Sequence, residues 1–273
     1  NWWLMLLKGI VLIVISFLLI SPVIRAQDKE EEFTAVYVTI TTIHGLVDFD
    51  FENWKAVEQE YFDKVTSQNE LILSHEVLLS YFNPEFAEIK IINVLSSWED
   101  IVEANERRME LIEKAWPDEE ERAAFFEKQN SFYRSLHSDE IFLSSIYSKS
   151  LVKEPGQNRP FTFMVKTNIL GDTEMEDSYD NYKTFAKEVI FKNSRILAYY
   201  PYHHFWGADS REFMEVYVFD TFSDVENSIY ESNALLSGIV PDETERKKCL
   251  TSLYSAIESQ KTAFYKNVPS LSK

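Results

Sequence analysis

Apolar and polar residues change their spacing at regular places along the chain, and this spacing predicts an order of strands and helices. Stretches such as Leu71–Tyr81, with apolar residues two apart, are typical of strands. Stretches such as Phe51–Val65, with apolar residues three, four and seven apart, are typical of helices with one buried face. From Phe33 the pattern predicts strand, helix, strand, strand, a helical region interrupted at Pro117, and a last strand over Glu140–Ile146.

The same order returns in the second half of the chain. A strand is expected from Phe161, a helix from Tyr179, two strands around Gly207, a long helical region, and a last strand over Ala263–Val268. Two short sequences recur. F-E-N-W-K at 51–55 returns as Y-D-N-Y-K 128 positions later, and P-D-E-E-E-R at 117–122 returns as P-D-E-T-E-R 124 positions later. We interpret this as a duplicated domain with one loop of altered length.

Each half therefore has the order β-α-β-β-α-β, which is the ferredoxin-like arrangement. We predict an α+β protein with a first repeat at 33–147, a linker at 148–160 and a second repeat at 161–268. Pro and Gly residues in the linker favour a boundary there.

Two ferredoxin-like repeats in one chain resemble the dimeric α/β-barrel superfamily, in which two sheets close face to face. Antibiotic-biosynthesis monooxygenases, NIPSNAP-like proteins, stress-responsive barrel proteins and chlorite-dismutase-like haem proteins belong to it. The resemblance covers nearly all of 33–268 and rests on element order and duplication, and no specific family is matched. It implies a pseudo-dimeric α/β barrel built from a single chain.

The first 26 residues differ from the rest of the chain. They hold one Lys, one Arg and no acidic residue, with an apolar run from Gly9 to Ile20 followed by Pro22. This is the pattern of a secretory signal peptide, and the A-Q junction at Ala26 resembles the cleavage site of exported Bacteroidetes proteins. The alternative is a retained membrane anchor over 2–20, about the length that a bilayer requires. Both interpretations place the rest of the chain outside the cytoplasm, in the periplasm or beyond the cell.

The excess of acidic residues limits the kinds of partner that the protein can bind. The chain carries 27 basic and 45 acidic residues, and removing residues 1–26 leaves 25 basic residues. Such a surface repels nucleic acid, which is bound by neutralising phosphates with Lys and Arg. A membrane partner is expected only if the N-terminal segment is retained. The single cysteine, Cys249, excludes an internal disulfide, and its apolar neighbours favour a buried, inert thiol.

No sequence motif for phosphate, dinucleotide or zinc binding is present, and neither is a nucleophile elbow. The run Glu119–Glu121 after Pro117 is interpreted as the start of a helix, so no metal is expected. Asn53 and Asn181, near the start of the first helix in each repeat, are expected to have structural roles. His137, Ser138 and Asp139 resemble a triad in sequence, but helix capping by Ser138 or Asp139 is the preferred interpretation.

Histidine is the main candidate for chemistry. A shift of 128 positions carries His75 onto His203, with His204 beside it, and both fall in the second predicted strand of a repeat. These three residues are the candidates for proton transfer or haem ligation. The alternative is a hydrogen-bonded histidine in the core that has no catalytic role.

Aromatic residues around this strand could line a pocket for a flat apolar ligand, and Tyr81, Tyr202 and Trp206 are the ligand-binding candidates. The alternative is that this aromatic cluster, which also includes Tyr199, Tyr200 and Phe205, is core. We predict an exported small-molecule-binding or interaction module without a required cofactor. An α/β-barrel enzyme of the monooxygenase or haem-dependent type is the alternative, and a structural surface protein is a third.

Overall fold

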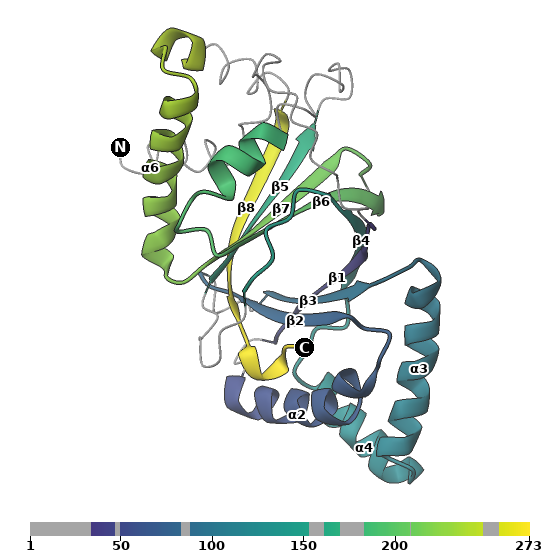
Figure 1. Ribbon diagram of the computed structural model, residues 1–273. Helices are drawn as coiled ribbons and strands as arrows, with labels where there is room; N and C mark the ends of the chain where they lie inside the picture. The colour runs from purple at the N-terminus through teal and green to yellow at the C-terminus, as the bar shows by residue number, and fades with distance from the viewer. Residues whose placement is uncertain are drawn as a thin grey trace. The chain divides into compact units, whose positions relative to one another are not determined.

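The computed structural model describes residues 34–46, 50–82, 88–152, 161–169, 183–207, 209–247 and 257–273 (Figure 1). Its strands hydrogen-bond in the order β1-β3-β2-β8-β5-β7-β6-β4, which closes into a barrel. This order confirms the α+β class and the two ferredoxin-like sheets, because each half has the order fourth-first-third-second strand. Within the described residues, no helix combines the length and the apolar composition needed to cross a bilayer. The predicted signal segment lies outside them.

The first repeat carries its helices on one side of its sheet (Figure 1). Its elements are β1 (Tyr37–His44), α2 (Phe51–Lys64), the short 3-10 helix η1 (Thr66–Gln68), β2 (Ser74–Ser80), β3 (Glu88–Leu95), α3 (Glu99–Ala115), α4 (Glu119–Asn130) and β4 (Ser138–Ser144).

The second repeat follows the same plan. Its elements are β5 (Phe161–Ile169), the π-helical turn η3 (Ala186–Ile190), β6 (Ala198–Trp206), β7 (Glu212–Phe219), α6 (Phe222–Ile239), β8 (Ile257–Asn267) and the 3-10 helix η4 (Pro269–Leu271). Most of the helix predicted from Tyr179, including Asn181, lies outside the described residues, and so does Cys249.

Three element boundaries differ from the prediction. Asp118 caps α4 by accepting hydrogen bonds from the backbone of Glu120 and Glu121, so Pro117 lies before the cap and not in the first turn. Strand β4 begins two residues earlier than expected because its pairing with β1 continues to Ser138. Strand β8 likewise begins earlier, at Ile257.

Residues from the end of the chain complete the core of the first repeat. Val268 and Leu271 are buried in one cluster with Trp54, Val77 and Ile89. The backbone of Lys273 exchanges hydrogen bonds with that of His75, at 2.9 and 3.2 Å. The compact unit around the first repeat therefore contains 264–273 in addition to its own strands and helices.

Hydrogen bonds show which positions correspond between the repeats. The Asn69 side chain donates to the Ala104 carbonyl at 2.9 Å, and Asn193 donates to the Ser228 carbonyl at 2.8 Å. The two donors are 124 positions apart, and so are the two acceptors. Three further hydrogen bonds recur with the same shift. The bond from Leu73 to Val94 recurs as Leu197 to Val218, that from Arg122 to Trp116 as Arg246 to Val240, and that from Ser97 to Asp100 as Thr221 to Asp224.

The strand register agrees with a shift of 124. Tyr37 pairs with Leu95 in the first sheet, and Phe161 pairs with Phe219 in the second. The shift of 128 positions therefore does not apply to these strands, and Phe161 corresponds to Tyr37. The recurrence of Pro117 as Pro241, which uses 124, is confirmed by the matching arginine contacts that follow each proline.

Candidate functional site: a polar pocket in the first repeat

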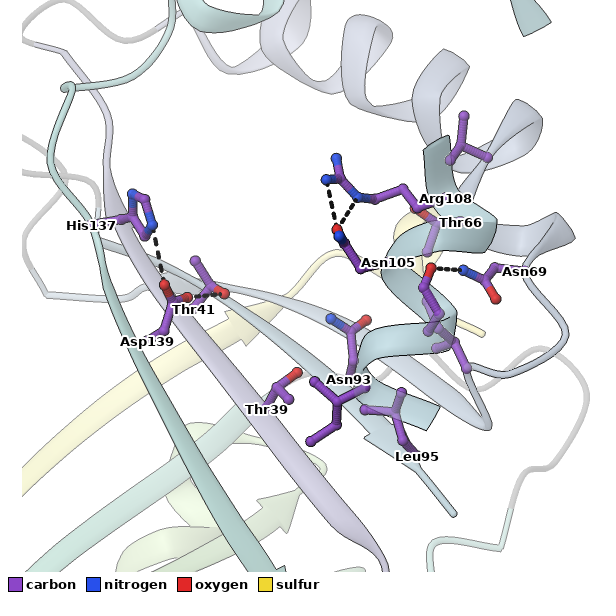
Figure 2. Close-up of a pocket in the computed structure, with 14 residues that line it drawn as sticks. Thr39, Thr41, Thr66, Asn69, Asn93, Leu95, Asn105, Arg108, His137 and Asp139 are labelled. Atoms are coloured by element: carbon purple, nitrogen blue, oxygen red, sulfur yellow. Dashed lines mark hydrogen bonds and ion pairs between the residues drawn. The ribbon is translucent and has the colours of Figure 1, made fainter. Parts of the chain in front are cut away.

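A pocket of about 640 Å³ lies between α3 and the sheet of the first repeat (Figure 2). Strands β1 and β3 contribute side chains from the face that also carries the core cluster around Trp54, because residues two apart in a strand share a face. Its lining residues are Thr39, Thr41, Val65, Thr66, Asn69, Ile72, Asn93, Leu95, Ile101, Ala104, Asn105, Arg108, His137 and Asp139.

One wall of the pocket carries a carboxylate. Asp139 lies opposite Thr41 where β4 pairs with β1, and its Oδ1 accepts a hydrogen bond from the Thr41 hydroxyl at 2.6 Å. Its Oδ2 lies 3.1 Å from Nε2 of His137. Both Asp139 and His137 are exposed, so the carboxylate is oriented by its neighbours while it stays accessible.

The facing wall carries a guanidinium group. Arg108 projects from α3, and its Nε and Nη2 both donate to Oδ1 of Asn105, at 3.2 and 2.8 Å. Figure 2 shows Arg108 and Asn105 across the opening from His137 and Asp139. The pocket therefore presents a positive group and a negative group on opposite sides.

The floor of the pocket combines polar strand residues with apolar ones. Asn93 pairs with Thr39 in the sheet, and its Oδ1 lies 2.7 Å from Nδ1 of His75. Val65 and Leu95 are buried beside them. A small organic molecule could contact apolar side chains at the floor and hydrogen-bonding groups at the walls, which is the usual composition of ligand pockets.

The corresponding positions of the second repeat are filled with aromatic rings. Across the first sheet one row of paired residues reads His75, Asn93, Thr39, and 124 positions later the row reads Tyr199, Tyr217, Phe163. All three of the latter are fully buried, and the rings of Tyr199 and Tyr217 lie 4.8 Å apart. The space that is a pocket in one repeat is packed core in the other.

The helices that cover the two sheets, α3 and α6, also carry different residues at matching positions. Asn105 and Arg108 of α3 correspond to Ile229 and Ser232 of α6. Ser232 is buried and its hydroxyl accepts a hydrogen bond from Asn193 at 2.8 Å, so the small residue lets α6 lie close to the preceding loop. The long Arg108 side chain remains exposed at the pocket.

A buried carboxyl group lies within the packed core of the second repeat. Oε1 of Glu215 accepts hydrogen bonds from the hydroxyls of Tyr199 and Tyr217, at 2.5 and 2.9 Å. Its Oε2 is buried with no partner among the described residues. Burial raises the pKa of Glu215 to about 8, although both tyrosine hydrogen bonds lower it. This group is therefore protonated at neutral pH.

The predicted histidine pair does not occupy matching positions. His75 corresponds to Tyr199, and His203 lies four residues further along β6, where it pairs with Phe213. His75 is buried, its ring lies 5.8 Å from that of Phe62, and Asn93 holds its Nδ1. Burial lowers the pKa of His75, although the hydrogen bond to Asn93 raises it. These contacts are those of a hydrogen-bonded core histidine.

His203 and His204 lie at the end of β6, outside the pocket of the first repeat. The ring of His203 lies 5.0 Å from that of Phe213, and desolvation by such neighbours lowers its pKa although the residue is exposed. Trp206 is 67% exposed, Tyr81 is 41% exposed, and Tyr202 is buried. None of these ligand candidates lines the pocket.

The three histidine candidates do not place a haem ligand in the pocket, because His75, His203 and His204 do not line it. A histidine that ligates haem iron presents one ring nitrogen to the space that the haem occupies. Nδ1 of His75 is held by Asn93, and His75 does not line the pocket. His137 does line it, but its Nε2 faces Asp139. Within the described residues, no group of three or more His, Cys, Asp or Glu could hold a metal ion either.

Apart from His137 and Asp139, the pocket residues are not recognisable from the sequence, and helix capping by Ser138 or Asp139 is the interpretation that the pattern favours. That assignment is wrong, because Ser138 and Asp139 begin strand β4 and Asp139 faces the pocket. The roles of Glu119–Glu121 and Asn53 are those expected: the first forms the start of α4, and Asn53 donates to the capping residue Asp50. A comparison of the repeats at a shift of 124 would have revealed the replacement of aromatic residues by Thr39 and Asn93.

No family model and no curated protein matches the chain. Solved structures do match it. A candidate monooxygenase from Fusobacterium nucleatum aligns with a TM-score of 0.57 at 10% identity, over 86% of this chain and 93% of that one. A second candidate monooxygenase, from Lactobacillus acidophilus, aligns at 0.54 and 9% identity, over 86% and 94%. A mutant chlorite dismutase from Candidatus Nitrospira defluvii aligns at 0.53 and 11% identity, over 86% and 92%.

These structures are dimeric α/β-barrel proteins. The chain has the same fold. At 9–11% identity the likeness concerns the arrangement of strands and helices, and it carries no residue of a catalytic site to this chain.

Proposed function

We propose that this protein binds a small organic molecule in the pocket between α3 and the sheet of the first repeat. The proposal rests on one observation: a row of His75, Asn93 and Thr39 lies where the second repeat places three buried aromatic rings. Cores pack to high density, and a space of about 640 Å³ beside hydrogen-bonding groups is of the size that ligands occupy.

The test is to fill the pocket with the side chain that the second repeat uses. Thr39→Phe places a ring where Phe163 lies in the second repeat, and Thr39 makes no side-chain hydrogen bond that the change would break among the described residues. We expect wild-type protein to bind members of a library of small organic acids, alcohols and amides in ligand-observed NMR. Thr39→Phe should abolish that binding and leave the thermal unfolding temperature within a few degrees of wild type.

Thr244→Phe is the matched control, because Thr244 is exposed on a helical turn of the second repeat. Binding by this variant should equal that of wild type. Retention of the same ligands by Thr39→Phe would contradict the proposal, and so would a library in which nothing binds to wild type.

An enzyme of the monooxygenase or haem-dependent type is the alternative that the fold allows. It has less support, because the histidine candidates His75, His203 and His204 lie outside the pocket. The binding proposal requires no cofactor and uses the pocket that the chain forms.

We also propose that the protein is exported and that residues 1–26 act as a signal peptide. The support is the apolar run, Pro22 and the A-Q junction at Ala26. N-terminal sequencing of protein recovered outside the cytoplasm should begin at Gln27. Recovery of the intact 2–20 segment in the membrane fraction would favour the retained anchor.

A further inference from the structure

We infer that the ligand is a monocarboxylic acid with an apolar body, whose carboxylate pairs with Arg108. This inference rests on the proposed function of the pocket and specifies the chemistry of its ligand. It follows from three features of the pocket: an arginine without a carboxylate partner, an apolar floor, and a carboxylate on the opposite wall.

Arg108 differs from the arginine next to it. Arg107 forms ion pairs with Glu70 at 3.2 Å and with Glu110 at 2.8 Å. Within the part of the chain that the structure describes, no carboxylate lies within ion-pair distance of Arg108, whose hydrogen-bonding neighbours are Asn105 and Tyr61. This is unexpected in a chain with 45 acidic and 27 basic residues, where carboxylates are abundant.

The guanidinium of Arg108 is nevertheless held in place. Nε and Nη2 both donate to Oδ1 of Asn105. The group also lies close to the hydroxyl of Tyr61: burial raises the pKa of this tyrosine, and the neighbouring Arg108 lowers it. An oriented guanidinium binds a carboxylate with less loss of conformational entropy than a mobile one.

The floor of the pocket favours an apolar body behind that carboxylate. Val65, Leu95 and Ala104 are buried at the pocket, and Ile72 and Ile101 are partly buried beside them. Hydrocarbon placed against these side chains removes apolar surface from water, which favours binding in proportion to the area covered.

The opposite wall disfavours a second anionic group. Asp139 lies across the opening from Arg108 (Figure 2), and its carboxylate would repel a second carboxylate on the ligand. A monoacid avoids this repulsion. The pocket should therefore select acids that carry a single charge.

Three probes of equal chain length separate these features: octanoate, octanamide and octanedioate. We expect calorimetry on wild-type protein to show octanoate binding about tenfold more tightly than either of the others, the scale of one charge-assisted contact. Arg108→Gln should weaken octanoate about tenfold and leave octanamide unchanged. Arg107→Gln is the control and should change neither, because Arg107 does not line the pocket.

The other possible outcomes contradict either the ligand class or the proposed binding function. Equal binding of octanoate and octanamide, an equal effect of Arg107→Gln, or no binding of octanoate to wild type would overturn the inference. If another compound then still binds in a manner that Thr39→Phe abolishes, the proposed function stands without this ligand class. If Thr39→Phe leaves all binding unchanged, the proposed function itself is wrong.

Discussion

The two repeats share their element order and many hydrogen bonds, yet they differ where α3 and α6 cover their sheets. The first repeat places Asn93 and Thr39 under its helix, and the second places Tyr217 and Phe163 at the same points of the sheet. One arrangement forms a pocket and the other a packed core. The backbone contacts kept in both, such as those of Asn69 and Asn193, show that the scaffold does not require the pocket.

This difference separates the roles of the repeats. Aromatic rings at the sheet surface of the second repeat bury apolar area and contribute to stability. The small polar residues of the first repeat bury less apolar area, and they place hydrogen-bonding groups around an open space. Substitutions that exchange the two kinds of residue therefore test whether the difference is one of function or only of packing.

The largest effect is expected where the second repeat is given the polar residue of the first. Tyr217→Asn removes a fully buried ring and one hydrogen bond to Glu215, so it should lower the free energy of unfolding by about 3–5 kcal/mol. Urea unfolding followed by circular dichroism measures this loss. The reverse exchange in the first repeat, Thr39→Phe, should cost less than about 1.5 kcal/mol, because a space exists for the ring. Similar losses for both variants would show that the two sites are packed alike.

A smaller effect concerns the buried carboxyl group of the second repeat. Its pKa rises from the ordinary 4.5 to about 8 on folding, so the unfolded chain loses this proton at lower pH than the folded chain does. The contribution of Glu215 to stability is therefore fully present below pH 4.5 and is lost as the pH rises towards 8. Glu215→Gln should remove this slope, so that the variant gains roughly 4 kcal/mol relative to wild type between those limits.

Glu212→Gln is the comparison for that experiment. Glu212 is on the same strand and lies 3.3 Å from Lys166, with part of its side chain exposed. The Glu212→Gln variant retains Glu215, so its stability should fall with rising pH as that of wild type does. A Glu215→Gln profile parallel to wild type between pH 5 and pH 8 would show that the carboxyl group is not protonated in the folded protein.

The smallest expected effect is the difference in stability between substitutions of His75 and of His203. His75→Leu leaves Oδ1 of Asn93 without its partner at the edge of the pocket and should cost about 1–2 kcal/mol. His203→Leu, at an exposed position, should change stability by less than about 0.5 kcal/mol. Thermal unfolding of both variants checks this order. Equal losses would restore the view that the two histidines are equivalent.

Element order was predictable from the sequence because apolar spacing reflects which face of each strand or helix is buried. The beginning of α2 at Phe51 and the interruption near Pro117 follow from that pattern. The pairing of His75 with His203 failed for a physical reason: strand register is fixed by backbone hydrogen bonds, and these follow a shift of 124.

The pocket was harder to predict. Thr39 and Asn93 are polar residues in strands, and Arg108 is a polar residue on a helix, so each has an ordinary explanation when taken alone. Their meaning comes from their proximity across β1, β3 and α3 and from the aromatic residues at the matching positions. Both require the register of the sheet, which apolar periodicity does not determine.

The packing of Val268 and Leu271 against Trp54 has a consequence for the order in which the molecule is made. A ribosome delivers the first repeat early, but the residues that close this part of its core emerge only after the whole second repeat has been translated. An N-terminal domain usually finishes folding while the rest of the chain is still being synthesised. The first repeat cannot follow this order, because Val268 and Leu271 form part of its core. The core around Trp54 is therefore complete only when the residues that follow β8 are present.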